Sequence, residues 1–212
     1  MSGAAVVRRV TGTELRTCCA PGVRAVYAAA FGQPPWNEEP AAADAYLERL
    51  AADAARPGFT AAVAFDGPGT CSGSDGPAPR AIGFATAWAT EAPLPDSRSY
   101  PQVAAALGAA RTEEWLHGAR QIDELAVRPD AHGLGAGRAL LAAVTRDAPD
   151  GRCWLLTSAQ AVDAVRFYRR VGWHQVTHPA EGGRGVAVFL GPDHPAAAAS
   201  RDTGEEAPAR FT

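Results

Sequence analysis

The segment Leu125–Leu141, LAVRPDAHGLGAGRALL, constrains the fold more than any other part of the chain. A short apolar run ends at Val127, a proline-containing turn follows, and Gly133, Gly135 and Gly137 lead directly into a helix-like run. This order of strand, glycine-rich turn and helix exposes backbone N–H groups at a helix N-terminus, which carries roughly half a positive charge and binds phosphate oxygens. Glycine also lets a ligand approach the bare backbone closely. The segment therefore predicts a site for a phosphate-bearing ligand.

Several nucleotide-binding folds use a glycine-rich turn, and the surrounding sequence argues against two of them. A Rossmann fingerprint requires G-x-G-x-x-G and an acidic residue after the next strand, whereas here the next predicted strand ends in Thr157–Ser158. A Walker A loop requires a lysine, and all twenty basic residues of this chain are arginines. The absence of lysine also excludes Schiff-base catalysis by a lysine amine.

The composition predicts a globular protein without a membrane span. A length of 212 residues suits one domain with tails, and the net charge of −3 argues against broad nucleic-acid binding. Because there is no signal-peptide pattern and no apolar stretch of about 18 residues, we expect a cytoplasmic protein. The spacing of the four cysteines does not suit zinc, and we expect buried thiols in a reducing compartment: Cys18, Cys19, Cys71 and Cys153.

Apolar periodicity and turn residues predict the element order β-αα-ββ-α-β-α-β-α-ββ. The predicted strands are residues 6–10, 59–65, 81–90, 121–127, 152–157, 173–177 and 185–190. The predicted helices are residues 13–31, capped by Thr13 and interrupted at Pro21–Gly22, then 41–55, 101–117, 137–148 and 162–171. Such alternation favours one α/β sheet with helices on its faces. Residues 66–80 are typical of a mobile hairpin loop and residues 192–212 of a disordered tail, so residues 1–191 form the predicted domain.

Two motifs in this order resemble the GNAT superfamily of acyl-CoA-dependent N-acetyltransferases. The first motif is a strand ending in L-x-V, then x-P, then Q/R-x-x-G-x-G/A, and a helix with paired leucines. His132 stands here where Gln or Arg is usual. The residues of this chain that correspond to the motif are Leu125, Val127, Pro129, His132, Gly133, Gly135, Gly137, Leu140 and Leu141. The second, N-x-x-A-x-x-x-Y-x-x-x-G-F, corresponds to Ala161, Ala164, Tyr168, Gly172 and Trp173, with Ala161 replacing Asn. The resemblance implies a single-domain GNAT-like fold: a mixed, mostly antiparallel central sheet flanked by helices.

The resemblance also implies acetyl-CoA as co-substrate and no metal. The main chain of Leu125–Val127 would pair with the pantetheine arm, and the N–H groups of Gly133–Arg138 would hold the pyrophosphate. The candidate cofactor-binding residues are Leu125, Ala126, Val127, His132, Gly133, Leu134, Gly135, Ala136, Gly137, Arg138, Ala164 and Tyr168.

The implied reaction is direct attack of an amine on a thioester, which needs a base, an oxyanion donor and an acid. Asp123 and Glu124 are the candidate bases. Because neighbouring strand positions face opposite sides, we expect only one to point into the site, and Asp123 is favoured by its parity with Leu125 and Val127. Glu124, or a strand-edge salt bridge at either position, is the alternative. The backbone N–H of Val127, or that of its neighbour, is the candidate oxyanion donor. Tyr168 occupies the general-acid position, the alternative being a tyrosine that only packs against the cofactor.

The acceptor pocket is expected near the early helices, with Phe31, Pro35, Trp36 and Glu38 as candidates. An aromatic wall with a carboxylate suits a cationic amine, although Trp36 also fits a simple packing role. Residues 91–117 form either a lid over the acceptor or plain scaffold. The expected function is transfer of acetyl from acetyl-CoA to a primary amine of a small molecule, in a possible homodimer, with neither nucleic acid nor membrane as partner. A protein acetyltransferase, acting on an N-terminal or lysine amine, and a non-catalytic acyl-CoA-binding module are the alternatives.

Overall fold

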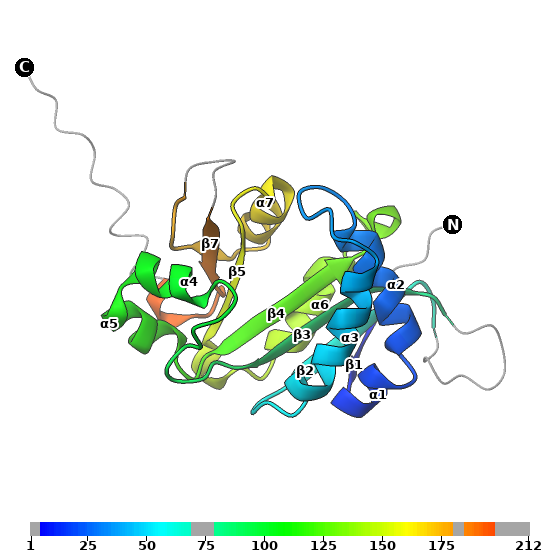
Figure 1. Cartoon of the computed structure of the whole chain (residues 1–212), viewed down its shortest axis with the longest axis horizontal. Helices are drawn as coiled ribbons and strands as arrows, with labels where there is room; N and C mark the ends of the chain where they lie inside the picture. Colours follow the sequence, from blue (N-terminus) through cyan, green and yellow to red (C-terminus); the bar gives the residue numbers. More distant parts are fainter. Residues whose placement is uncertain (1–4, 69–78, 180–184, 198–212) are drawn as a thin grey trace, which may run out of the picture. The chain divides into compact units, whose positions relative to one another are not determined.

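The computed structural model describes residues 5–68, 79–179 and 185–197 (Figure 1). The chain forms two compact units, residues 1–89 with 120–147 (unit 1) and residues 90–119 with 148–212 (unit 2). Unit 1 contains β1 (Val6–Val10), α1 (Gly12–Arg16), α2 (Ala20–Phe31), α3 (Ala41–Asp53), β2 (Thr60–Phe65), β3 (Ala81–Ala89), β4 (Arg120–Val127), η2 (Pro129–Ala131) and α6 (Ala136–Thr145). Unit 2 contains α4 (Tyr100–Leu107), α5 (Ala109–Arg111), η1 (Thr112–Leu116), η3 (Pro149–Gly151), β5 (Cys153–Ser158), α7 (Val162–Arg170), β6 (His174–Gln175) and β7 (Val186–Leu190).

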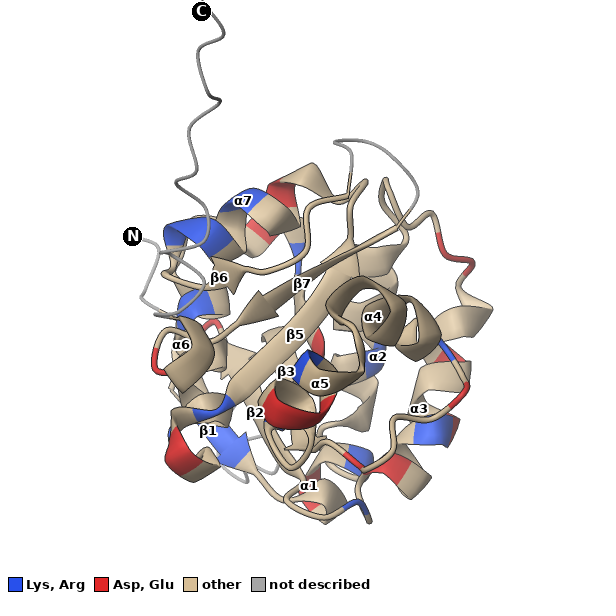
Figure 2. Cartoon of the chain, turned by 90° about the vertical axis from the view of Figure 1, so that its left-hand side faces the viewer, with Lys and Arg blue, Asp and Glu red and all other residues tan. Residues whose placement is uncertain are grey.

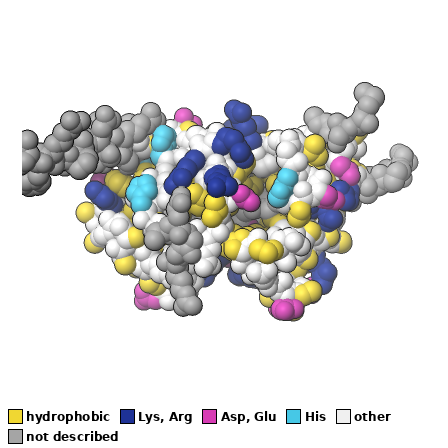
Figure 3. Space-filling view, turned by 90° about the horizontal axis from the view of Figure 1, so that it is seen from above, with side chains coloured by type: hydrophobic (Ala, Val, Ile, Leu, Met, Phe, Trp, Pro, Cys, Tyr) yellow, Lys and Arg dark blue, Asp and Glu magenta, His cyan; other side chains and the backbone are white. Residues whose placement is uncertain are grey.

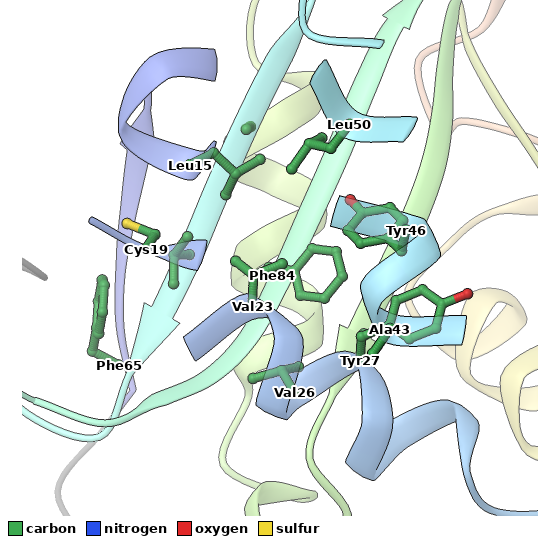
Figure 4. Packing of buried hydrophobic residues seen from close by; sticks show 13 residues of the cluster. Leu15, Cys19, Val23, Val26, Tyr27, Ala43, Tyr46, Leu50, Phe65 and Phe84 are labelled. Atoms are coloured by element: carbon green, nitrogen blue, oxygen red, sulfur yellow. The ribbon is translucent and has the colours of Figure 1, made fainter. Parts of the chain in front are cut away.

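The sheet of unit 1 is an antiparallel meander in the order β1-β2-β3-β4. Helices α1, α2 and α3 cover one face and α6 covers the other (Figure 1). The core beneath α1–α3 is built from aliphatic and aromatic side chains of these helices and of β2, β3 and β4 (Figure 4). β4 is therefore held between two helical layers, with its end leading into η2 and α6.

The first helical region begins and breaks at other residues than predicted. Its N-cap is Thr11, not Thr13, because Thr11 and Glu14 form a reciprocal capping box. The interruption lies between α1 and α2, before Pro21–Gly22, which belong to the first turn of α2. A proline in the first helical turn removes no intrahelical hydrogen bond, so it starts this helix instead of breaking it.

The strands of unit 2 pair antiparallel in the order β5-β7-β6. The single helix predicted over residues 101–117 is divided, because Gly108 has a φ of +79° that ends α4 before α5 and η1 begin. Tyr100, Val103 and Leu116 from this region pack with Trp154 of β5 in one apolar core. Side chains from residues 100–116 therefore contribute to the core of unit 2.

The ordered structure continues past the predicted boundary at residue 191. His194 and Ala197 are buried, and His194 Nε2 lies 3.0 Å from the carbonyl oxygen of Trp115. The remainder of the predicted tail, residues 198–212, lies outside the described residues, as do residues 69–78 of the predicted hairpin loop.

The cysteines differ in part from the predicted set of buried thiols. Cys19 is buried and disulfide-bonded, whereas Cys18 and Cys153 remain thiols. Cys71 lies outside the described residues. The expectation of a wholly reduced set is therefore wrong for Cys19.

The predicted α/β class, with a mostly antiparallel sheet flanked by helices, is confirmed, since the strand pairs within both units are antiparallel. In the described ranges, no helix combines the length and the apolar character needed to cross a bilayer.

Candidate active site

The glycine-rich turn forms an open backbone cradle between β4 and α6. Gly133 and Gly135 have φ values of +82° and +77°, a left-handed conformation that favours glycine. A side chain built at either position would meet no atom within 4 Å. Gly135 is the N-cap of α6 and provides no side-chain hydrogen bond to the first turn. The first N–H groups of α6, from Ala136 onward, therefore remain available to an external acceptor such as a phosphate oxygen.

The hydrogen bonds between β3 and β4 determine which main-chain N–H and C=O groups of β4 point away from β3. The Arg128 N–H donates to the Ile82 carbonyl oxygen at 2.9 Å. Because hydrogen-bonding direction alternates along an antiparallel strand, the N–H and C=O of Ala126 face β3, and those of Leu125 and Val127 face away from it. Of the three predicted pantetheine-pairing positions, Leu125 and Val127 thus have the suitable backbone direction, while Ala126 contributes to the core of unit 1.

The backbone N–H of His132, a candidate donor to the cofactor, is already used within the protein. Its N–H already donates to the Pro129 carbonyl oxygen at 3.2 Å, which closes the η2 turn. Its exposed ring instead places Nε2 3.2 Å from the Val127 carbonyl oxygen, at the end of β4. Sequence reasoning missed this ring contact, because the five-residue separation brings the two groups together only through the η2 turn.

The remaining residues of the cradle are Leu134 and Arg138, and both side chains are exposed. Arg138 lies in the first turn of α6, where its positive charge opposes the helix dipole. A bound anion at this N-terminus would make that placement favourable.

A β-bulge lies at the two candidate bases on β4. Glu124 pairs with Thr86 and Ile122 pairs with Ala87, so Asp123 is an extra residue without a register partner in β3. A bulge interrupts the strict alternation of side chains, and the parity argument that only one carboxylate can face the site does not hold here. The negative charges of both Asp123 and Glu124 raise the pKa of Tyr46, although burial of its ring is the larger cause.

An ion-pair network on α3 holds Glu124. Arg49 Nη2 lies 3.2 Å from Glu124 Oε1, and Arg49 Nε lies 3.3 Å from Asp53 Oδ2. Asp53 is buried and also pairs with Arg56 at 3.0 Å. The Arg49 guanidinium stacks on the Tyr46 ring, 5.2 Å from its centroid. Glu124 is thus positioned by a guanidinium that is itself fixed by a second carboxylate and a ring.

Three of the four predicted acceptor residues are brought together at the C-terminal end of α2. The Phe31 and Trp36 rings meet edge to face at 5.8 Å, and the Glu38 N–H donates to the Phe31 carbonyl oxygen at 2.9 Å. Pro35 lies exposed in the intervening loop, after a cis Pro34–Pro35 bond. These contacts extend inward through Tyr27, whose ring lies 4.6 Å from that of Phe31.

Tyr27 and Tyr46 belong to this region and were not among the predicted site residues. Their rings stack at 4.8 Å, and Tyr46 contacts the Phe84 ring at 5.4 Å. Burial raises the pKa of Tyr27, and the negative charges of Glu124 and Glu38 act in the same direction. Apolar spacing on α2 and α3 suggests only core positions for both tyrosines, because their polar contacts come from another helix, a loop and a strand.

In unit 2, Tyr168 and Ala164 lie on α7, as the second motif predicts. Tyr168 is 8% exposed, and its ring packs on Phe167, Trp173 and Phe189 at centroid distances of 5.3–6.2 Å. Gly172 follows the helix with a φ of +89°. α7 carries exposed arginines, which account for its blue segments in Figure 2: Arg166, Arg169 and Arg170. Dark blue side chains also gather on the face of the molecule shown in Figure 3. Among the described residues, no group of three or more His, Cys, Asp or Glu side chains could hold a metal.

Comparison with known proteins agrees with this arrangement. A family model described as an acetyltransferase (GNAT) domain matches residues 99–175, which include β4, the cradle, α6 and α7. No match was found among the curated proteins.

Similar solved structures cover nearly the whole chain at low identity. One is NAA60 from Arabidopsis thaliana in complex with acetyl-CoA, with 16% identity, a TM-score of 0.53, and coverage of 88% of this chain and 97% of that one. Another, a histone acetyltransferase HPA2 and related acetyltransferase from Corynebacterium glutamicum, has 18% identity, a TM-score of 0.50, and coverage of 91% and 99%. A protein from Pyrococcus horikoshii has 14% identity, a TM-score of 0.54, and coverage of 88% and 98%. These solved structures share the fold of this chain, and the family match shows that the part containing β4, the cradle, α6 and α7 is similar to a GNAT acetyltransferase domain.

Proposed function

We propose that this protein is an N-acetyltransferase that moves an acetyl group from acetyl-CoA to a primary amine of a small molecule. The observation that carries the proposal is the open cradle at Gly133–Arg138, which directly follows a strand bearing two carboxylates. Left-handed glycines, an uncapped helix N-terminus and outward-facing N–H groups suit a diphosphate. A small-molecule acceptor is favoured over a protein by the aromatic rings and carboxylates that surround Tyr27.

Acetyl-CoA, as co-substrate, supplies the acetyl group as a thioester. In the proposed reaction, the cradle N–H groups hold its diphosphate, and the main chain of Leu125 and Val127 pairs with its pantetheine arm. A carboxylate on β4 takes a proton from the acceptor amine, and the new N–C bond forms as the C–S bond breaks. The Val127 N–H donates to the developing oxyanion, and the Tyr168 hydroxyl protonates the departing sulfur.

The two carboxylates of β4 are not equivalent as bases. Arg49 lies 3.2 Å from Glu124 and holds this carboxylate in an ion pair with α3. Asp123, displaced by the bulge, is the favoured base. Glu124 is the second candidate.

The test is a thiol-release assay with acetyl-CoA and a panel of small amines, preceded by titration of the purified protein with acetyl-CoA. Tyr168→Phe and Asp123→Asn are each expected to lower kcat by about 10²-fold or more, because each removes a proton-transfer group. Loss of rate only in Glu124→Gln would reassign the base. Binding of acetyl-CoA with no thiol release from any amine or peptide would indicate a binding module, and release with peptides alone would indicate a protein acceptor. Absence of acetyl-CoA binding would contradict the proposal as a whole.

A further inference from the structure

The region around Tyr27 combines an aromatic row with carboxylates in a way that packing alone does not explain. The rings of Trp36, Phe31, Tyr27, Tyr46 and Phe84 form a continuous row with centroid distances between 4.6 and 5.8 Å. Tyr27 is almost fully buried, yet its hydroxyl points away from the aliphatic side chains of the core (Figure 4). The Glu38 carboxylate lies near this hydroxyl and contributes to its raised pKa. The Tyr27 hydroxyl, which is a polar end of this row of rings, therefore points away from the core.

Glu38 has an unmet hydrogen-bonding requirement. Its Oε2 atom is buried, and no donor reaches it from the described part of the chain. A buried carboxylate oxygen without a donor is costly, since such groups are normally hydrogen-bonded. An ammonium N–H of a bound molecule would supply the missing donor, close to the Tyr27 hydroxyl.

The charges around the row favour a cation. Three negatively charged carboxylates surround the row: Glu38, Asp123 and Glu124. The charges of Glu38 and Glu124 raise the pKa of Tyr27. The charges of Asp123 and Glu124 raise the pKa of Tyr46. Arg49 pairs with Glu124 and neutralises one of the three. The rings of Phe31 and Trp36, which are only partly buried, add attraction for a cation. The row therefore carries a net negative charge beside rings, which suits an ammonium group.

The chemistry of acyl transfer requires that this ammonium is not the reacting nitrogen. An attacking amine must be neutral, because a protonated nitrogen has no lone pair. Held at a carboxylate, an amine instead stays protonated. One molecule satisfies both demands only if it has two basic nitrogens, one held as a cation and the other deprotonated by the base on β4.

We propose that Glu38, positioned by the Tyr27 hydroxyl, selects acceptors that carry a second, protonated amine, so that the preferred substrates are diamines. This inference rests on the proposed acetyltransferase function and adds its substrate class. Glu38 is the specificity-determining residue and Tyr27 is a positioning residue that acts through it.

The experiment compares diaminobutane, butylamine and aminobutanol as acceptors in the thiol-release assay. For the unmodified protein, kcat/KM for diaminobutane is expected to exceed that for the other two amines by on the order of tenfold, the usual effect of one hydrogen bond to a charged group. Glu38→Gln is expected to remove this preference mainly by raising KM for diaminobutane. Tyr27→Phe, which keeps the stacked ring, is expected to reduce the preference in the same direction.

Glu39→Gln is the matched control, because it removes the same charge from the next position of the loop, where the side chain is exposed. It is expected to keep the full preference for diaminobutane. Equal kcat/KM values for the three amines in the unmodified protein, or the same preference in Glu38→Gln and Glu39→Gln, would overturn the inference and leave the acetyltransferase function standing. If Glu38→Gln does not fold, an unchanged preference in Tyr27→Phe overturns it equally. Thiol release from none of these amines, nor from the wider panel, would overturn the proposed function itself.

Discussion

Asp53 illustrates how much a single buried carboxylate contributes at the scale of one residue. It is 4% exposed, lies at the end of α3 and pairs with the guanidinium groups of Arg49 and Arg56. Arg56 in turn stacks on the Trp88 ring, 4.9 Å from its centroid. Asp53 thus connects the arginine that holds Glu124 to the packed face of β3.

Asp53→Asn is expected to lower the free energy of unfolding by about 1–3 kcal/mol, because it leaves two charged donors without their ionised acceptor. Urea unfolding at neutral pH measures the change. Asp44→Asn is the control: Asp44 pairs with Arg24 through two short contacts, but both side chains are exposed, so water replaces the interaction. Equal midpoints for the two variants would show that the Asp53 network does not stabilise the fold.

Residue-level reasoning from the sequence located the carboxylates but not their geometry. The order Asp123-Glu124 before the cofactor turn is visible in the sequence, and alternation predicts opposite faces. The bulge depends on the register between β3 and β4, which no local pattern specifies. The ion pair between Arg49 and Glu124 joins residues 75 positions apart and likewise follows only from packing.

At the scale of an element, the start of α6 shows a compromise between stability and ligand access. Its N-cap is Gly135, a residue with no side chain to satisfy the first N–H groups, where Ser, Thr, Asp or Asn is usual. The helix is therefore less well capped than α1, which has a complete capping box. Such an end is expected where a ligand, and not a side chain, supplies the hydrogen-bond acceptors.

Gly135→Ala is expected to lower the free energy of unfolding by about 1–2 kcal/mol, because an alanine at a φ of +77° adopts the unfavourable left-handed conformation. The loss is conformational and not steric, since a Cβ at this position meets no atom within 4 Å. Thermal unfolding provides the measurement.

The comparison variant is Gly67→Ala, whose Cβ also meets no atom and whose φ lies outside the left-handed range. It is expected to cause no loss of stability. A loss as large in Gly67→Ala as in Gly135→Ala would show that the strain argument is wrong for this turn.

At the scale of the whole molecule, unit 2 is assembled from two chain segments separated by β4 and α6. Polar contacts join them: Trp154 Nε1 donates to Thr90 Oγ1 at 2.6 Å in the interior, and the Arg152 guanidinium donates to the Glu114 and His117 carbonyl oxygens nearer the surface. His194 adds a third contact, because its Nε2 donates to the Trp115 carbonyl oxygen while its Nδ1 accepts from the Ala196 N–H. This pair of bonds requires a neutral imidazole.

Burial lowers the pKa of His194 below its ordinary value of 6.5. As the pH falls, the His194 imidazole therefore binds a proton in the unfolded chain before it does so in the folded protein. The free energy of unfolding then decreases from about pH 6.5 down to the folded-state pKa of His194. This range lies above the pH at which carboxylates titrate. His194→Gln is expected to be less stable near neutral pH but to lose less stability between about pH 8 and about pH 5.5. Urea unfolding at several pH values measures this slope. His178→Gln, at an exposed position, should keep the original slope, and an unchanged slope in His194→Gln would contradict the assignment.

The sequence by itself determined the features that depend on local patterns. Period-two and helical spacing predicted nearly all the elements, and the glycine spacing after Val127 predicted the cradle, because turn conformation depends on residues next to each other in the chain. Boundaries moved where a cap or a single glycine decided them, at Thr11 and Gly108.

Tertiary structure alone decided what surrounds the candidate bases. The bulge at Asp123, the ion pair of Glu124 with Arg49, and the influence of Glu124 on the pKa of Tyr27 each depend on the packing of α2, α3 and β3 against β4. Local propensities do not encode these contacts, because their partners are far apart in sequence and meet only when apolar faces are buried together.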